Sequence, residues 1–452
     1  MNTRLFRALA LAGAAALLPI STAAMSQVDA GSAREMSELI GVMQRIKAFY
    51  VDDVDDDKLI EGAISGMLSS LDPHSSYLNE RAYSDLMTQT EGEYGGLGLT
   101  VTMEDDAVKV IAPTADTPAD KAGIKAGDFI THLNGKLIYG GTLDEAVEQM
   151  RGEPGTDITL TIFRPGRDKP FDVTITRAII DLEPVKWETK DDVGIITISS
   201  FTDGAGADVR AAMKAIDQKL GHKPLGYILD LRSNPGGLLD EAVNVSDDFL
   251  NDGEIVSQRG RRRADTLKFF AKPGDAASGL PVIVLIDAGS ASASEIVAGA
   301  LQDRHRALVM GERSFGKGSV QTIVPLTNDT GLRLTTARYY TPSGRSVQEG
   351  GIDPDIRVPQ LSDPDYASRT NIRESDLRRH LINELAADDK ALEEDQKDDP
   401  RFSMTADELK AQGIEDFQLH YALETIGRLG KNGQLGAAAA KTAPAKKKAA
   451  TN

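Results

Sequence analysis

The sequence Pro281-Val-Ile-Val-Leu-Ile-Asp-Ala-Gly-Ser-Ala-Ser-Ala-Ser-Glu295 joins an apolar run to a cluster of serines, and an amphipathic stretch from Glu295 to Asp303 follows it. This order predicts a buried strand, a turn and a helix. The serines then lie at a helix N-terminus, where backbone N–H groups point outward and favour negative charge. A second short strand, Ala307–Gly311, leads to Ser314-Phe-Gly-Lys-Gly-Ser-Val-Gln321 and brings a lysine back beside the serines. A Ser-Lys hydrolase needs this arrangement, because a serine hydroxyl is inert until a base takes its proton.

Several further motifs occur along the chain in a fixed order. They are Phe49-Tyr-Val51, Leu71-Asp-Pro-His-Ser-Ser-Tyr77, Tyr94-Gly-Gly-Leu-Gly-Leu99, Leu229-Asp-Leu-Arg-Ser-Asn-Pro-Gly-Gly-Leu238, Phe315-Gly-Lys-Gly318 and Arg338-Tyr-Tyr-Thr-Pro-Ser-Gly344. Together with the serine cluster they resemble the carboxyl-terminal processing proteases, secreted serine endopeptidases that carry a PDZ domain. The resemblance covers roughly Phe49 to Ile356.

The resemblance assigns roles to three residues. It implies that Ser292 is the nucleophile, that Lys317 is the general base and that Gln321 orients the lysine. The lysine follows the serine by 25 residues and the glutamine follows the lysine by four, which fits the family pattern. Taken without the resemblance, Ser290 and Ser294 are placed as well as Ser292. The run from Ser292 to Glu295 also fits a capping box, whose serine does no chemistry.

A lysine that acts as a base must be neutral. For use near pH 7 to 8, its pKa must fall by roughly 3 units from about 10.4, and burial can supply this change. We expect an apolar wall around Lys317 that comes from the strand and helix beside the serines, with Gln321 bonding the amine without adding charge. The expected wall residues are Ile283, Val284, Leu285, Ile296, Val297 and Leu301.

A second strand-turn-helix pattern supplies donors for an oxyanion. Asn234-Pro-Gly-Gly237 follows the apolar run Tyr227–Leu231 and precedes a helical pattern over Leu238–Leu250. Glycines let backbone N–H groups approach a substrate closely. We therefore expect the oxyanion to be held by the N–H of Ala293 together with that of Gly236 or Gly237.

Competing chemistries find little support. The six histidines show no metal-ligand spacing, so no metal site is predicted, and the absence of cysteine excludes thiol catalysis, disulfides and zinc thiolate sites. A Ser-His-Asp triad that uses His305 and Asp303 is an alternative, although both are expected to point away along the helix after the serine. No cofactor is implied.

The N-terminus reads as a signal peptide over residues 1–24. Arg4 and Arg7 precede an apolar run from Ala8 to Ile20, and Thr22-Ala-Ala24 suits cleavage. The mature protein is then expected in the periplasm, with an uncleaved anchor as the alternative and membrane association in that case. The formal net charge of −18 argues against nucleic acid as a partner.

The fold class expected is α/β multidomain. Residues 33–88 form an N-terminal helical arm, with an acidic break at Asp52–Asp57 that is a helix start rather than a calcium loop. Residues 91–180 resemble an inserted PDZ domain, β-rich with two helices. Residues 185–358 form the serine protease core, which the resemblance makes a crotonase-like α/β spiral rather than a chymotrypsin-type barrel. Residues 359–430 form a C-terminal segment, helical over 374–396 and 404–429 and guessed to serve assembly, before a disordered Ala/Lys-rich tail at 431–452.

The PDZ-like segment offers a site for a peptide carboxylate. Its loop would use Gly96, Leu97, Gly98 and Leu99, whose successive N–H groups can cradle a chain terminus. The groove helix would run from Thr142 to Arg151. Arg151 at its end is a substrate-side residue that, by resemblance, can link peptide occupancy to the core, whereas the plain alternative is a cation at a helix end.

The sequence thus predicts an exported serine endopeptidase that recognises substrate C-termini through its PDZ domain and cleaves by a Ser-Lys dyad, processing or degrading cell-envelope proteins. Expected partners are protein substrates with apolar C-termini, an adaptor protein as the resemblance allows, and further copies of the chain, paired as a homo-oligomer through the terminal helices. The alternative is a catalytically silent PDZ scaffold or chaperone. A crotonase-like acyl-CoA enzyme is disfavoured by export and by the PDZ insertion.

Overall fold

The computed structural model describes residues 30–432 except 105–106, 115, 139–142, 168, 182, 370 and 386–401. The predicted signal peptide and the Ala/Lys-rich tail beyond residue 432 lie outside the described residues, as does Thr142. None of the described helices is long and apolar enough to cross a membrane.

The chain divides into two compact units, with the boundary after Met67. The described part of the first unit is helical, with α1 (Ala30–Phe49) followed by α2 (Asp56–Ser69), which runs across the boundary. The acidic break between them begins a helix, as expected: the Asp55 carboxylate accepts a hydrogen bond from the Asp57 N–H at 3.0 Å.

The second unit begins with a short strand and a helix, β1 (Ser76–Leu78) and α3 (Glu80–Glu91), and then contains a β-rich insertion. Its sheet is antiparallel in the order β3-β4-β5-β7-β8, with β6 (Lys136–Leu137) beside β5. The strands are β3 (Leu99–Glu104), β4 (Ala107–Pro113), β5 (Phe129–Leu133), β7 (Asp157–Phe163) and β8 (Phe171–Thr176), and the helices are α4 (Pro118–Lys121) and α5 (Leu143–Met150).

The chain enters and leaves this insertion through one antiparallel pair, β2 (Glu93–Gly96) with β9 (Ala178–Asp181). Alternate residues of β7 are buried, as a sheet with one covered face requires.

The other half of the second unit is built on a six-stranded sheet in the order β10-β11-β12-β15-β16-β19. The strands are β10 (Val185–Lys190), β11 (Val193–Ile198), β12 (Tyr227–Asp230), β15 (Val282–Ile286), β16 (Leu308–Gly311) and β19 (Ile356–Arg357), and all neighbours from β11 onward are parallel. Because parallel strands end at one edge of a sheet, the turns after β12 and β15 lie side by side. These turns carry the predicted oxyanion loop and the serine cluster.

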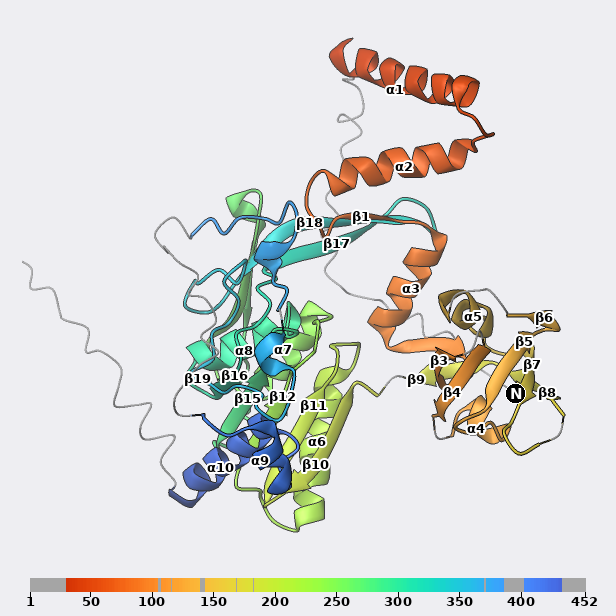
Figure 1. Cartoon of the computed structure of the whole chain (residues 1–452). Coiled ribbons are helices and arrows are strands. Elements are labelled where there is room, and N and C mark those ends of the chain that lie inside the picture. The colour runs from red at the N-terminus through yellow and green to blue at the C-terminus, as the bar shows by residue number, and fades with distance from the viewer. Residues whose placement is uncertain are drawn as a thin grey trace, which may run out of the picture. The chain divides into compact units, whose positions relative to one another are not determined.

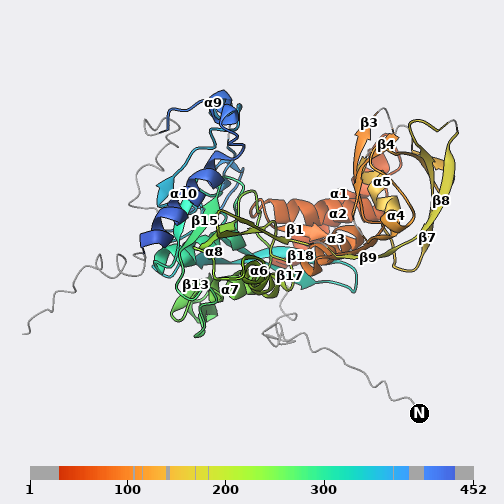
Figure 2. The same ribbon diagram turned by 90° about the horizontal axis from the view of Figure 1, so that it is seen from below.

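Helices cover both faces of this sheet. On one face α6 (Ala205–Leu220), α7 (Leu239–Asp247) and α8 (Ala293–Asp303) share a core with alternate residues of β15, including Val284. On the other face, α9 (Ala406–Ala411) and α10 (Phe417–Asn432) lie over the sheet, with α10 along β15 (Figures 1 and 2). All five residues of β15 are buried as a result.

Strand alternation corrects one expectation about the wall around the lysine. Ile283 and Leu285 belong to the core under the C-terminal helices, with Phe417 and Ile426. Successive side chains of a strand point to opposite faces, so these two residues cannot share the face that Val284 presents to α8.

A second sheet carries the other half of the predicted site. Its long strand β18 (Gly331–Tyr340) pairs with β1, with β13 (Glu254–Gly260) and with β17 (Ser319–Pro325), and β14 (Thr266–Phe270) pairs with β13. The loop between β16 and β17 contains Lys317, and Gln321 follows a bulge within β17.

The helix predicted over 374–396 is wrong for the residues that are described. Only a single 3₁₀ turn, Glu374–Asp376, forms, and residues 377–385 contain no helix. The charged pattern looks helical, but Glu374 is fully buried and its carboxylate is bonded to His74 and Gln348, which draws this segment onto the rest of the chain in an extended path. The helical segment predicted over 404–429 agrees better with the structure, because α9 lies within it and α10 overlaps it.

Candidate active site

Ser292 occupies the residue just before α8, at the sharpest point of the turn that follows β15. Its backbone has φ 53° and ψ −110°, in the left-handed half of the map that serine rarely adopts. A strained strand-to-helix turn of this kind pushes a serine hydroxyl outward from the fold. Ser292 is partly exposed, and its hydroxyl makes no cap hydrogen bond to the helix.

The neighbouring serines have other tasks. Ser290 and Ser294 are fully buried. The Ser290 hydroxyl donates to the Leu231 carbonyl at 2.8 Å, and the Ser294 hydroxyl donates to the Asn234 carbonyl at 2.9 Å. These two side chains hold the serine turn against the neighbouring loop, which leaves Ser292 as the member of the cluster that faces solvent.

One buried carboxylate joins the serine turn to the lysine loop. Glu295 Oε2 accepts hydrogen bonds from the N–H groups of Ser292 at 2.7 Å and Lys317 at 2.9 Å. Its Oε1 accepts from the Ser314 hydroxyl at 2.6 Å and the Gly316 N–H at 2.7 Å. Two nitrogen atoms bound to one oxygen lie within about 6 Å of each other, so the backbones of the two predicted catalytic residues are adjacent.

Glu295 has no exposed surface. Burial raises the pKa of its carboxyl to about 7, although the donors from Ser314, Gly316, Ser292 and Lys317 all favour the ionised form. The sequence indicated Glu295 only as a helix cap. Glu295 also bridges to a loop about twenty residues later. Nothing in the sequence indicates this second task except that an acid occurs in an apolar helix.

The Lys317 side chain is largely enclosed. Burial lowers the pKa of its amine, and the positive charge of Arg333 lowers it further, against the opposing effect of Glu374, Glu295 and Asp72. The net direction is the one that a neutral general base requires.

The glycine loop after β12 lies against the serine. A Cβ atom placed on Gly236 would approach the Ser292 Cβ to 2.8 Å and the Ala291 carbonyl oxygen to 2.9 Å, so only glycine fits there. The Gly236 N–H donates to the Asn234 side chain at 2.9 Å. Within the described residues, the N–H groups of Gly237 and Ala293 have no acceptor. Of the two glycines left open by the sequence, this geometry favours Gly237 as the partner of Ala293.

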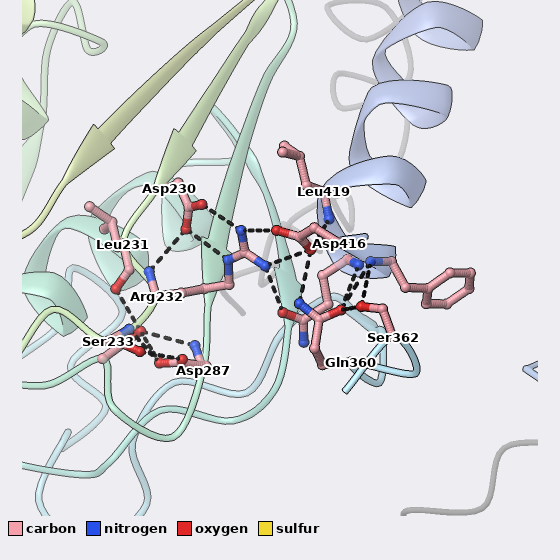
Figure 3. Close-up of polar contacts among 12 residues, drawn as sticks. Asp230, Leu231, Arg232, Ser233, Asp287, Gln360, Ser362, Asp416 and Leu419 are labelled. Carbon is pink, nitrogen blue, oxygen red and sulfur yellow. Dashed lines mark hydrogen bonds and ion pairs between the residues drawn. The ribbon is translucent and has the colours of Figure 1, made fainter. Parts of the chain in front are cut away.

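Arg232, which lies just before the glycine loop in the sequence, bonds to two carboxylates, as Figure 3 shows. Its guanidinium bonds to the Asp230 carboxylate at 2.6 and 2.9 Å and to the Asp416 carboxylate, at the start of α10, at 2.7 and 2.9 Å. The next residue, Ser233, donates its N–H to Asp287 at 2.8 Å, and the same Asp287 oxygen accepts the Gly289 N–H at 2.9 Å. Sequence reasoning missed this network, since Arg232 and Asp416 are far apart in the chain.

Gln321 is held by its amide nitrogen. Nε2 donates to the Ser319 hydroxyl at 3.0 Å and to the Thr335 hydroxyl at 3.2 Å. No hydrogen bond joins Gln321 to Lys317 in the part of the chain that is described. The amide oxygen of Gln321 has no hydrogen-bond partner among these residues.

The loop of the β-rich insertion has the donors expected for a carboxylate site. The N–H groups of Leu97 and Gly98 find no acceptor among the described residues, while their carbonyls are bonded to Ala119 and Thr114. Gly98 has φ 76°, and a Cβ there would lie 2.3 Å from Thr117, so glycine is required. Gly96 is in β2 and Leu99 begins β3, at the two ends of this loop.

Arg151 points to another element. Its Nη1 lies 3.1 Å from Asp85 on α3, and its guanidinium stacks over Tyr94 at 5.1 Å from the ring centre. The last carbonyls of α5 are instead bonded by Arg177, which donates to Met150 at 3.0 Å and to Gln149 at 2.9 Å. Arg177 is thus the cation that caps this helix, which the sequence did not indicate.

The two residues of the alternative Ser-His-Asp triad, Asp303 and His305, lie at the far end of α8. Asp303 ends this helix, about 16 Å along the axis from Ser292 at a rise of about 1.5 Å per residue. Asp303 there accepts the Ser343 N–H at 2.9 Å, and His305 lies beyond it. No group of three or more His, Cys, Asp and Glu side chains suited to a metal ion occurs among the described residues.

Three known protein families match parts of the chain. Residues 192–358 match the model of peptidase family S41, residues 95–175 match the PDZ domain and residues 12–82 match the activating protease CtpB N-terminal domain. The carboxy-terminal-processing protease of Bartonella bacilliformis is 50% identical over 376 residues, which are 83% of this chain and 87% of that protein. The carboxy-terminal processing protease CtpB of Bacillus subtilis is 35% identical over 350 residues, 76% of this chain and 72% of that protein.

Among solved structures, the photosystem II D1 C-terminal processing protease is 27% identical and covers 77% of this chain and 99% of its own, with a TM-score of 0.43. The family resemblance and the fold class expected from the sequence are confirmed. The chain belongs to the carboxy-terminal processing proteases of peptidase family S41, and it is a serine peptidase with an inserted PDZ domain.

Proposed function

We propose that this peptidase cleaves by a Ser292–Lys317 dyad and selects its substrates by their C-termini. The observation that carries the proposal is the shared carboxylate: one buried oxygen of Glu295 binds the backbones of both residues. A partly exposed serine on a strained turn and a partly buried lysine with a lowered pKa are thereby brought together.

In the proposed reaction, the Ser292 oxygen attacks a peptide carbonyl carbon while the Lys317 amine takes the hydroxyl proton. The negative charge on the carbonyl oxygen is met by the N–H groups of Ala293 and Gly237, which have no other acceptor in the described part of the chain. Lys317 then gives the proton to the departing amine. Water attacks the acyl-serine with Lys317 again as base. Lys317 then gives that proton to the departing Ser292 oxygen, the new carboxyl terminus leaves, and both groups are restored.

The PDZ domain supplies the selection of substrates. The N–H groups of Leu97 and Gly98, which have no acceptor among the described residues, suit a terminal carboxylate. The strand β3 and the helix α5 on either side suit an apolar last residue. A charged terminus satisfies these donors, whereas an amide leaves them poorly paired. Proteins with a free, apolar C-terminus are the substrates that follow.

Export is part of the same proposal. The composition of residues 1–24 is that of a signal peptide, and a protease that acts on unfolded chain ends is suited to the cell envelope. Envelope proteins that are processed or degraded from their C-termini are the substrates we infer.

The test compares purified wild type with Ser292→Ala and Lys317→Ala on an unfolded protein and on a fluorogenic peptide with an apolar free C-terminus. Both variants should retain peptide binding and lose cleavage. Ser278→Ala is a matched control, because Ser278 is exposed and has the same positive φ of 53°. Lys272→Ala serves as the exposed lysine control. A tenth of wild-type activity in either dyad variant rules out the dyad.

Selection is tested on the same peptide with an amidated C-terminus. Weaker capture and slower cleavage of the amide support the PDZ assignment. Equal cleavage of both forms removes the PDZ domain from substrate selection and leaves the dyad untouched.

A further inference from the structure

The turn Leu71-Asp-Pro-His-Ser75 reaches the proposed catalytic residues through a chain of hydrogen bonds. Asp72 is buried, and its Oδ1 accepts the N–H groups of His74 at 2.9 Å and Ser75 at 2.8 Å. Its Oδ2 accepts the Ser75 hydroxyl at 2.7 Å. Burial opposes the ionisation of Asp72, but the bonds from Ser75, His74 and Thr335 hold the pKa of this carboxyl below its usual value.

The chain continues to β18. The Thr335 hydroxyl donates to Asp72 Oδ1 at 3.1 Å, and the Thr335 N–H donates to the Ser75 oxygen at 3.1 Å. Thr335 lies directly across from Gln321 in the pairing of β17 with β18. The Gln321 amide nitrogen reaches the Thr335 oxygen at 3.2 Å. The turn before β1 is thus two hydrogen bonds away from Gln321.

Counting protons fixes the direction of each bond. An ionised carboxylate can only accept, so Asp72 takes the one hydroxyl proton of Thr335. The Thr335 oxygen must then accept from Gln321, and only the NH₂ end of the amide can donate. A glutamine amide can otherwise be turned over with little change in shape. The acceptor-only carboxylate removes that freedom and leaves Gln321 Oε1 facing away from Thr335.

We infer that Asp72 and Thr335 are positioning residues that set the orientation of the Gln321 amide, so that its oxygen, and not its nitrogen, is presented to the Lys317 amine. An oxygen there accepts an N–H of the amine and leaves the nitrogen lone pair for the Ser292 proton. A reversed amide would donate to that lone pair and block the base. The inference rests on the proposed Ser292–Lys317 function and assigns a task to the Leu71–Tyr77 motif within it.

The decisive variant is Thr335→Val, which keeps the shape of the side chain and removes the hydroxyl. With the fluorogenic peptide, kcat should fall by roughly tenfold to a hundredfold, and KM should not change. The upper figure is the smallest rate enhancement that a general base usually contributes. Thr335→Ser keeps the hydroxyl and should retain most of wild-type kcat. The control is Thr336→Val, which removes an exposed Thr322–Thr336 hydroxyl pair of 2.6 Å on the other face of the same strands.

A double-mutant cycle separates orientation from general support of the fold. Thr335→Val should cost nothing further in a Gln321→Ala background, because the amide that it orients is gone. Asp72→Asn should lower kcat in the same way, since its NH₂ group can donate to Thr335 and reverse the direction of the chain. Melting temperatures check that each variant is folded.

Equal losses from Thr335→Val with and without Gln321 overturn the inference, as does wild-type kcat in Thr335→Val. Wild-type kcat in Gln321→Ala also overturns it, although the dyad proposal then stands. Cleavage that survives in Ser292→Ala is a different result, because it removes the proposed function itself.

Discussion

Arg232 and Asp416 form a two-pronged ion pair, with Nη1 to Oδ1 at 2.9 Å and Nη2 to Oδ2 at 2.7 Å, that ties the loop of the proposed oxyanion site to the residue just before α10. The C-terminal segment is thereby bonded to the stretch of chain that leads into the loop beside Ser292. Its helix also covers one face of the central sheet.

Asp416→Asn should weaken the ion pair with Arg232, which anchors the glycine loop. One acceptor and the charge are lost, which should cost roughly 1 to 2 kcal/mol of unfolding free energy for a partly buried charged bond, and kcat should fall severalfold. Denaturant unfolding and peptide cleavage measure the two effects. Glu415→Gln is the control, because it removes one negative charge from the adjacent, exposed position. A loss of stability with unchanged kcat would show that the ion pair stabilises the fold without positioning the loop.

Glu295→Gln should separate bridging from capping. The amide offers one acceptor oxygen where the carboxylate offers two, so Ser292 and Lys317 lose their shared partner and activity should fall roughly a hundredfold, as for a small misplacement of reacting groups. The matched control is Glu408→Gln, since Glu408 also caps a helix and accepts the Thr405 N–H at 2.8 Å. Comparable activity in the two variants would reduce Glu295 to a helix cap.

The same carboxyl predicts opposite trends of stability and activity with pH. Its pKa is raised from 4.5 to about 7, so its contribution to stability is complete below pH 4.5 and is lost as pH rises through 7. Its ionised form is the one that accepts four donors, so activity should rise over that range. Melting temperatures of wild type and Glu295→Gln between pH 5 and 8 measure the difference, which should shrink as pH rises. A difference that grows with pH contradicts the assignment.

Arg333→Gln should move the acid limb of the kcat/KM profile to higher pH. The positive charge of Arg333 helps to lower the pKa of Lys317, so its removal raises that pKa and delays the appearance of the neutral amine. Arg333→Lys keeps the charge and should keep the limb near its wild-type position. Arg357→Gln on the surface is the charge control, since Arg357 pairs with Asp353 at 3.1 Å. A limb that stays in place or moves to lower pH contradicts the role of Arg333.

Arg151→Ala should leave the melting temperature almost unchanged, because Arg151 and Asp85 are each 43% exposed and such pairs contribute at most about 1 kcal/mol. Peptide-stimulated cleavage should nevertheless change severalfold if this arginine links the PDZ domain to the core, as the family resemblance implies. Cleavage with and without an added apolar peptide measures it. Lys109→Ala, which breaks the exposed Lys109–Glu104 pair, is the control in the same domain. If the added peptide stimulates cleavage equally in wild type, Arg151→Ala and Lys109→Ala, Arg151 only forms a surface ion pair and does not link the PDZ domain to the core.

The local elements of the site could be predicted from the sequence because their signals are local. The apolar run into β15 and the serine cluster before α8 are consecutive residues, and the Asn-Pro-Gly-Gly loop repeats the same pattern after β12. The family resemblance then supplied the roles that spacing alone left open. It chose Ser292 among three serines, and the burial of Ser290 and Ser294 gives a physical reason for that choice.

The remaining parts depend on contacts that no local pattern records. Asp72 meets Thr335 across 263 positions, and Arg232 meets Asp416 across 184. The helix wrongly expected at 374–385 has the same cause, a contact between residues far apart in the sequence. In the sequence Glu374 resembles a solvated helix residue, but in the structure its carboxylate is bonded to His74. Arg177 rather than Arg151 caps α5 because β8 ends beside the helix terminus, which is a tertiary fact.

The position of α10 has a consequence for the order in which the enzyme matures. A chain is made from its N-terminus, so a ribosome has already produced Ser292 and Lys317 long before Asp416. Until that residue arrives, Arg232 lacks one of its two carboxylates, and the face of the sheet that holds Ile283 and Leu285 is uncovered. The loop beside Ser292 therefore gains its full anchoring only after the C-terminal segment has been made and has folded onto the sheet.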